Sequence, residues 1–216
     1  DLAWQSHWDK PENYNESNTW EGPPDRKYQE FRLNYNTNNW NLKRANSDIL
    51  PAHTVYLDLI PDEQTLLARM KPKTRYNIHL AARKGVTVRR AGMEELPLWY
   101  KLYSDTAQRN GIFLNDIEYF KSVLAAKADD TLSPATVELL LAEKDGEALA
   151  AIFLVLSGNR GTYLYGASSS QHRNCMPTYA LQWEAIRIAK ASGCTEYDMF
   201  GVSPGPEPSH PMYGLY

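Results

Sequence analysis

The chain has 216 residues, and that length predicts one domain with part of another. Its net charge is −3 and its basic residues are scattered apart from one cluster, so nothing demands the coating mode of nucleic-acid binding, in which most of one face is basic, and a local contact with RNA stays open. No apolar run reaches the roughly 18 residues needed to cross a bilayer, and two cysteines outside any Cys-x-x-Cys pair fit a reducing, cytoplasmic compartment.

The first half of the chain divides into a part without clear periodicity and a patterned part. Residues 1–50 are rich in Asn and Trp and allow no assignment. Residues 54–60 alternate like a strand, and Asp62 is the expected N-cap of a helix over 63–70. Pro72 precedes a second, basic helix that Gly85 ends, and residues 86–90 follow as a strand.

A second unit begins near Met93. Apolar residues at helical spacing predict helices over 94–108 and 116–126. Strands over 136–143, 148–156 and 162–166 follow, then a helix over 178–191 and a strand over 196–200. This order is that of GNAT-type acyltransferase domains. We therefore predict an α/β (α+β) fold, with residues 93–216 forming a GNAT-like domain, C-terminally truncated, and residues 1–92 forming part of a first, similar domain that ends in the basic helix.

Four segments, in this order, give the chain a specific resemblance. They are Lys71–Val86 (KPKTRYNIHLAARKGV), Leu102–Phe113 (LYSDTAQRNGIF), Tyr163–Ser169 (YLYGASS), and Asp198–Tyr216 with its DMFGVSP and HPMYGLY runs. Together they resemble the FemABX family, bacterial transferases that move an amino acid from aminoacyl-tRNA to the peptide of a peptidoglycan precursor. The resemblance implies a fragment lacking both ends, because a lysine thought to serve catalysis usually follows the Gly-Leu-Tyr of the family.

The resemblance also implies partners and a location. The acyl donor would be an aminoacyl-tRNA and the acceptor a lipid-linked or nucleotide-linked precursor, with no cofactor. The protein would be cytoplasmic, with a peripheral position at the inner face of the membrane left open. Two alternatives remain: a coenzyme A-dependent GNAT N-acyltransferase, and a non-catalytic module that binds the precursor.

The basic helix carries Lys71, Arg75, His79 and Arg83 at intervals of four, which predicts a cationic stripe along one face. Arg75 and the neighbouring Lys73 are candidates for contact with phosphate or tRNA, since a guanidinium grips phosphate through two hydrogen bonds. A solvated surface stripe is the alternative.

Arg109 and Phe113 lie where a helix gives way to a loop. In the family, an arginine and an aromatic residue at this spacing contact the precursor, so the resemblance assigns both to substrate binding. The alternative for Arg109 is a cap on helix carbonyls. Tyr163 and Tyr165 stand two apart on one strand and should therefore share a face. The resemblance implies that they contact substrate, and a place in the core is the alternative.

The loop over residues 171–177 bears on the donor. Coenzyme A would need a glycine-rich turn whose N–H groups cradle its pyrophosphate, but this loop has no glycine and contains Pro177. Arg173 in the loop is a further substrate-binding candidate. No His and Cys spacing matches a metal site. No catalytic residue can be assigned, except that Asp198 is a weak candidate, either bonding a loop or accepting a proton from the attacking amine.

Overall fold

The computed structural model describes residues 54–128 and 135–203, and residues 55–200 form one compact unit. Its elements, in chain order, are β1 (Tyr56–Asp58), α2 (Glu63–Arg69), α3 (Pro72–Arg83), β2 (Thr87–Ala91), η4 (Met93–Glu95), α4 (Leu96–Asn110), α5 (Ile117–Ala125), β3 (Lys127–Ala128), β4 (Ala135–Lys144), β5 (Glu147–Ser157), β6 (Arg160–Ser168), η5 (Arg173–Cys175), α6 (Pro177–Ala191) and β7 (Glu196–Asp198).

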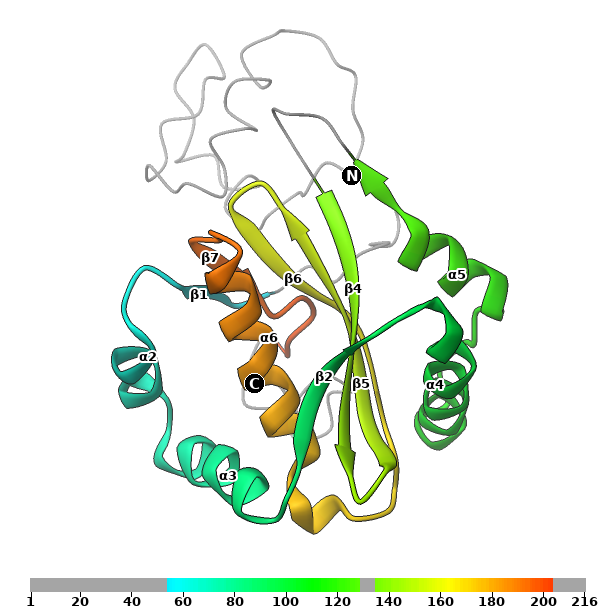
Figure 1. Cartoon of the computed structure of the whole chain (residues 1–216), viewed down its shortest axis with the longest axis horizontal. Coiled ribbons are helices and arrows are strands. Elements are labelled where there is room, and N and C mark those ends of the chain that lie inside the picture. Colours follow the sequence, from blue (N-terminus) through cyan, green and yellow to red (C-terminus); the bar gives the residue numbers. More distant parts are fainter. Residues whose placement is uncertain (1–53, 129–134, 204–216) are drawn as a thin grey trace, which may run out of the picture. The chain divides into compact units, whose positions relative to one another are not determined.

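The strands form one sheet in the order β1-β7-β6-β5-β4-β2, with the short β3 paired to β4 beside β2. Neighbouring strands are antiparallel except β6 and β7, which run parallel. Only three residue pairs join β6 to β7, from Arg160 and Glu196 to Thr162 and Asp198. The rest of β6 continues past the end of β7, and the two strands separate there (Figure 1).

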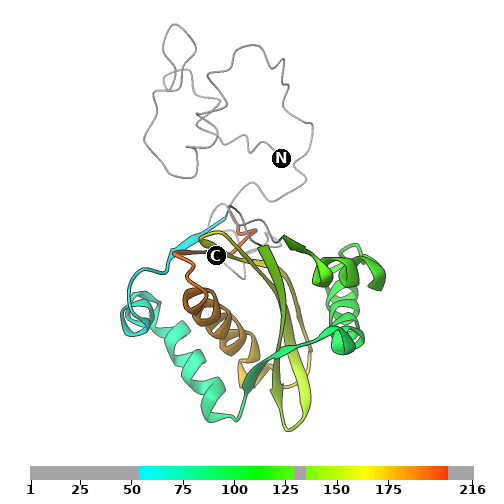
Figure 2. The ribbon, with the colours of Figure 1, turned by 45° about the horizontal axis from the view of Figure 1, so that its top comes forward.

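Helices cover both faces of this sheet, with α2, α3 and α6 on one face and α4 and α5 on the other (Figures 1 and 2). The strands supply alternate residues to the two cores, as a pleated sheet requires. Leu140 and Ile152 pack under α6, whereas Leu141 and Phe153 pack under α4 and α5. Both faces of the central strands are therefore buried, and β4 and β5 are correspondingly apolar.

Local sequence signals fix most of the element ends. The Asp62 carboxylate accepts a hydrogen bond from the Thr65 N–H at 2.7 Å, which confirms the predicted N-cap. Pro72 takes the first position of α3, where its missing N–H costs no helical bond. Asp145 and Gly146 both adopt positive φ, the conformation of a tight two-residue hairpin turn between β4 and β5.

The predicted elements are confirmed with shifts of a few residues, and the GNAT-like order of two helices, an antiparallel meander, a helix and a strand is present. The predicted boundary near residue 92 falls inside the compact unit, because β2 pairs with β4 across it. β1, α2 and α3 thus belong to the same layered structure as the later elements. The assignment of residues 1–92 to a partial first domain stays a prediction, since residues 1–53 lie outside the described residues.

Within the described ranges, none of the helices combines the length and the apolar character required of a membrane span.

Candidate functional site

A β-bulge in β6 sends two neighbouring tyrosines to opposite faces of the sheet. Phe153 of β5 pairs with Tyr165 and Leu154 pairs with Tyr163, so Leu164 is the extra residue. Tyr165 packs into the aromatic core under α4 and α5, whereas Tyr163 packs into the core under α6. The expectation that both rings share one face is therefore wrong, because one inserted residue reverses the alternation.

Tyr163 is held in the α6 core against Gly166. A Cβ added at Gly166 would lie only 1.9 Å from the Tyr163 hydroxyl oxygen, so the strand needs glycine at this position. Burial raises the pKa of Tyr163 to about 12, which keeps the phenol neutral. Tyr163 is nevertheless only partly buried and packs against the edge of this core, so its predicted part in binding substrate stays a prediction.

Tyr165 lies at the other face, at the edge of the aromatic core. Its hydroxyl oxygen is 2.6 Å from that of Tyr119 on α5, and its ring meets Tyr103 of α4 edge-on at 6.3 Å between centroids. Burial first, and then the hydrogen bond with Tyr119, raise the pKa of Tyr165. Tyr119 is 41% exposed, so this pair of phenols is open to solvent and can donate or accept a hydrogen bond.

Arg109 joins the end of α4 to the end of β6. Its guanidinium donates to the Ser168 carbonyl at 3.1 Å and to the Ser170 hydroxyl at 3.2 Å. The buried Thr106 hydroxyl accepts a bond from the Ser168 N–H at 3.0 Å. None of these Arg109 bonds goes to a carbonyl of α4, so the alternative of a cap on helix carbonyls finds no support in the described residues. With Thr106, Tyr119, Tyr165 and Ser168 it makes up a polar strip that we call the α4–β6 site.

Phe113 stands outside this network. It is 85% exposed, on the loop that follows the left-handed Gly111 at the end of α4. No ring contact links it to the described residues. An aromatic side chain this exposed has no packing role, so its predicted part in binding substrate stays a prediction that the geometry permits.

Four backbone N–H groups in the loop between β6 and α6 and in the first turn of α6 are engaged in local hydrogen bonds. The Cys175 and Met176 N–H groups donate to the carbonyls of His172 and Arg173, and those of Tyr179 and Ala180 return to Met176. Pro177 has no N–H. These bonds favour the prediction that this loop is no pyrophosphate cradle, which stays a prediction. Arg173 is exposed on this loop.

Asp198 ends β7 in a buried position. Its carboxylate accepts the Phe200 N–H at 2.8 Å, so it bonds the following loop, one of the two roles proposed from the sequence. Phe200 adopts a left-handed φ of 59°, a conformation that this bond helps to hold. Asp198 also faces Tyr56 of β1, whose pKa is raised by burial and then by this carboxylate. A catalytic role for Asp198 stays a prediction.

Arg75 has a structural role that the sequence did not suggest. Its guanidinium donates to the Ala68 carbonyl at 2.9 Å and to that of Met70, so it satisfies the free carbonyls at the end of α2. Lys73, in contrast, points outward on α3 and is exposed. The predicted stripe is therefore exposed at Lys71, His79 and Arg83 but is interrupted at Arg75.

Metal chemistry finds no support in the part of the chain that the structure describes. In residues 54–128 and 135–203, no group of three or more His, Cys, Asp or Glu side chains could hold an ion. Cys175 and Cys194 are both buried free thiols. Burial, and then Glu196, raise the pKa of Cys194, so less of this thiol is present as the nucleophilic thiolate.

Comparison with known families matches the FemAB family over residues 33–139 and 127–216. These matches cover most of the sequence. The chain belongs to the FemAB family. The family resemblance stated from the sequence is thereby confirmed.

The curated relatives of this FemAB chain include two staphylococcal proteins named lipid II:glycine glycyltransferase. The one from Staphylococcus epidermidis strain RP62A is 25% identical over 225 aligned residues, covering 78% of this chain and 54% of the relative. The one from Staphylococcus aureus is 23% identical over 230 residues, covering 78% and 55%. The chain thus spans about half the length of the curated relatives it matches.

Solved structures confirm the fold class. The crystal structure of FemX matches with a TM-score of 0.69 at 22% identity, over 77% of this chain and 57% of that one. The C-terminal domain of a putative lysylphosphatidylglycerol synthetase from Agrobacterium fabrum matches with a TM-score of 0.50 at 13% identity, over 70% and 47%. At these identities the likeness indicates a shared fold and does not indicate a shared substrate.

Sequence reasoning missed two members of the α4–β6 site. Thr106 and Tyr119 sit at ordinary helical positions. Nothing in their spacing predicts their contacts with Ser168 and Tyr165, which lie 62 and 46 positions further along the chain. The bulge had one available signal, because a glycine inside a strand often marks a bulge or a close approach of neighbouring groups. Gly166 is such a glycine.

Proposed function

We propose that this chain carries the catalytic fold of an aminoacyltransferase that moves an amino acid from aminoacyl-tRNA to the stem peptide of a peptidoglycan precursor. Membership of the FemAB family over residues 33–216 is the observation that carries this proposal. The staphylococcal relatives are named for transfer of glycine to lipid II, which supports a lipid-linked precursor as the acceptor class.

The β6–α6 loop supports an ester donor other than coenzyme A. In a coenzyme A enzyme, free N–H groups at this loop and at the start of the following helix would hold the pyrophosphate. Here the Cys175 and Met176 N–H groups bond within the loop, two N–H groups of the first turn of α6 bond the Met176 carbonyl, and Pro177 has no N–H. An aminoacyl-tRNA presents its amino acid as an activated ester and does not need this cradle.

The proposed reaction does not require the protein to form a covalent bond with either substrate. The neutral amine of the acceptor attacks the ester carbonyl, the new C–N bond forms, and the C–O bond to the tRNA ribose breaks. One proton passes from the amine to the leaving hydroxyl. Since the ester is already activated, the protein chiefly has to align the two groups and stabilise the oxyanion. No nucleophilic side chain or covalent intermediate is required.

The α4–β6 site is our candidate for the acceptor. The Arg109 guanidinium can hold a phosphate or carboxylate of the precursor while it remains anchored on Ser168. The phenols of Tyr119 and Tyr165, 2.6 Å apart, offer hydrogen bonds to a peptide group. The exposed Phe113 and Arg173 complete the proposed acceptor contacts. Tyr163 faces the opposite core, so we give it no direct contact.

A lipid-linked acceptor would place the enzyme at the inner face of the membrane, and we propose a cytoplasmic protein that binds there peripherally.

The proposed function is tested by measuring amino-acid transfer by the protein at its natural length. It is mixed with charged tRNA, or with an acyl-coenzyme A, and with lipid-linked or nucleotide-linked precursor. We expect a precursor heavier by one amino acid with a tRNA donor only. A product formed from the coenzyme A thioester would contradict the proposal.

A further inference from the structure

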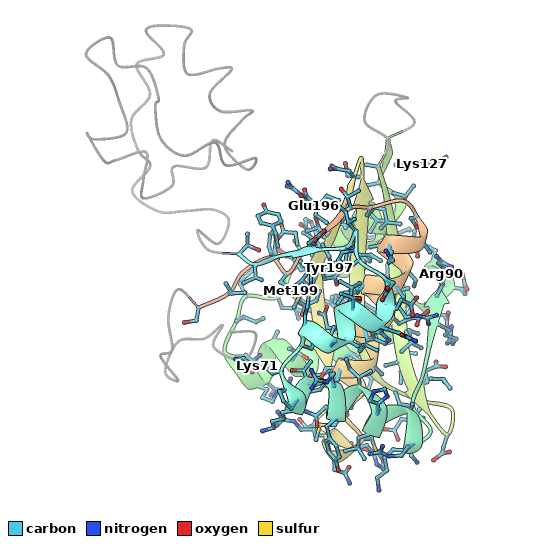
Figure 3. All side chains as sticks on the ribbon, turned by 90° about the vertical axis from the view of Figure 1, so that its left-hand side faces the viewer. Lys71, Arg90, Lys127, Glu196, Tyr197 and Met199 are labelled. Carbon is cyan, nitrogen blue, oxygen red and sulfur yellow. The ribbon has the colours of Figure 1, made fainter. Side chains whose placement is uncertain are left out.

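The surface of α3 is positively charged without compensation. The segment from Lys71 to Val86 contains no Asp or Glu. Its exposed cationic side chains, which we call the basic face of α3, are Lys71, Lys73, His79, Arg83 and Lys84. Figure 3 labels Lys71 at the start of this helix and shows nitrogen-tipped side chains gathered along it. The histidine adds charge only when it is protonated.

Most arginines on the rest of the described surface form ion pairs, unlike the cations of α3. Elsewhere in the described ranges most arginines have carboxylate partners within 4 Å: Arg69, Arg89, Arg90, Arg160 and Arg187. In contrast, no ion pair involves the basic face of α3 within those same ranges. Although the net charge of the chain is −3, several neighbouring cations on α3 have no carboxylate within 4 Å among the residues that the structure describes. Such a cluster attracts a polyanion.

We propose that the basic face of α3 is a docking surface for the phosphate backbone of RNA. This inference rests on the proposed function, in which the donor is an aminoacyl-tRNA. From Lys73 to Arg83 the face extends about 15 Å along the helix axis, which is long enough to meet several consecutive phosphates. Arg75 takes no part, because its guanidinium is engaged by the carbonyls at the end of α2.

The composition of this face favours RNA over an anionic membrane. A helix that lies on a bilayer inserts large apolar side chains beside its basic ones. In α3 the apolar residues Ile78 and Ala81 are buried against the core. Tyr76 is the exposed aromatic residue, and the Arg83 guanidinium lies 5.6 Å from its ring centroid. A guanidinium held over a tyrosine ring presents a planar cation to phosphate or to an unpaired base.

The experiment measures binding of fluorescein-labelled, deacylated tRNA to the 216-residue chain by fluorescence anisotropy, over a range of salt concentrations. The test variant is the pair Arg83→Gln with Lys84→Gln. The matched control is Lys101→Gln with Lys121→Gln, which removes the same charge from α4 and α5 on the opposite face of the sheet. Circular dichroism establishes that each variant is folded.

We expect the α3 pair to weaken tRNA binding by about tenfold or more near physiological salt, and to reduce the slope of log affinity against log salt by about 1.4 to 1.8 for two lost phosphate contacts. The control pair should change affinity by less than about twofold. Equal losses in the two pairs would overturn the proposal, since they would indicate attraction by net charge alone. If the double variant fails to fold, Lys73→Gln replaces it, with an expected reduction in slope of about 0.7 to 0.9.

Vesicles of phosphatidylcholine with 30% phosphatidylglycerol provide the opposing arm. If the α3 pair abolishes binding to vesicles and leaves tRNA binding unchanged, the face is a membrane contact and the RNA proposal is wrong. Precursor binding, measured separately by calorimetry, should be the same in both pairs. If the unaltered chain does not bind precursor, that result counts against the proposed function and not against this surface.

Discussion

Replacing Tyr163 with phenylalanine tests the bulge in β6, because the bulge alone places this phenol in the core under α6. The pKa of Tyr163 is raised by burial to about 12, compared with about 10 in an unfolded chain. The neutral phenol of the partly buried Tyr163 stabilises the folded state fully below pH 10. That stability is lost as the pH rises from 10 to 12, because the unfolded chain releases its proton first.

The size of the effect follows from the two pKa values. At pH 11 the difference amounts to about 1.4 kcal/mol, and it approaches about 2.7 kcal/mol at pH 12 and above. Tyr163→Phe removes the ionisable group, so the variant should gain stability relative to the original chain as the pH rises. At pH 7 the two should differ by less than about 1 kcal/mol, because the hydroxyl makes no hydrogen bond within the described residues.

The assay is urea unfolding, followed by circular dichroism, at pH 7, 9, 10, 10.5 and 11. Other buried tyrosines such as Tyr197 also have raised pKa values and contribute in both proteins, so the comparison uses the difference between the two proteins. Tyr76→Phe, on an exposed ring of α3, controls for the loss of one hydroxyl. A difference that stays constant from pH 7 to pH 11 would refute the placement of Tyr163 in the core.

Three further variants test the site and its supports. Arg109→Ala should weaken binding of a nucleotide-linked precursor by about tenfold or more in titration calorimetry, and unchanged affinity would remove this residue from the acceptor site. Asp116→Ala removes the bond from the Asp116 carboxylate to the Tyr119 N–H at 2.7 Å and should lower the free energy of unfolding by about 1 kcal/mol, whereas Asp116→Asn should preserve most of it in the same urea titration. Gly161→Ala would bring its Cβ to 2.6 Å from that of Ala189, so we expect a loss of about 1 to 3 kcal/mol. Adding Ala189→Gly should restore part of that loss, and strictly additive effects would contradict the contact.

The order of elements could be predicted from the sequence because each end carries its own chemical signal. Asp62 supplies a carboxylate for a helix start, and Asp145-Gly146 supplies the two positive φ angles of a hairpin turn. The extent of a domain has no such local signal. β2 pairs with β4, from Thr87 and Glu143 to Ala91 and Leu139. Because these partners are far apart in the sequence, a local pattern could not reveal that the chain continues as one unit across residue 92.

In the candidate site, too, some residues could be predicted from the sequence and others could not. Arg109 and Tyr165 were predicted through the family resemblance, and both lie in the α4–β6 site. Their partners Thr106 and Tyr119 were not predicted, because contact between α4, α5 and β6 depends on packing across the sheet. Arg75 shows the converse: its position in a periodic basic stripe suggested phosphate, yet the nearby end of α2 offers carbonyls that its guanidinium bonds instead.

The central claim is that this fold accepts a peptidoglycan precursor and a charged tRNA, and that coenzyme A is not its donor. Titration calorimetry measures it most directly, using three ligands on the same chain: the nucleotide-linked muramyl pentapeptide, a tRNA whose amino acid is attached by a stable amide, and acetyl-coenzyme A. We predict saturable binding of the first two and none of the third. Saturable binding of acetyl-coenzyme A, or a failure to bind the precursor, would contradict the account.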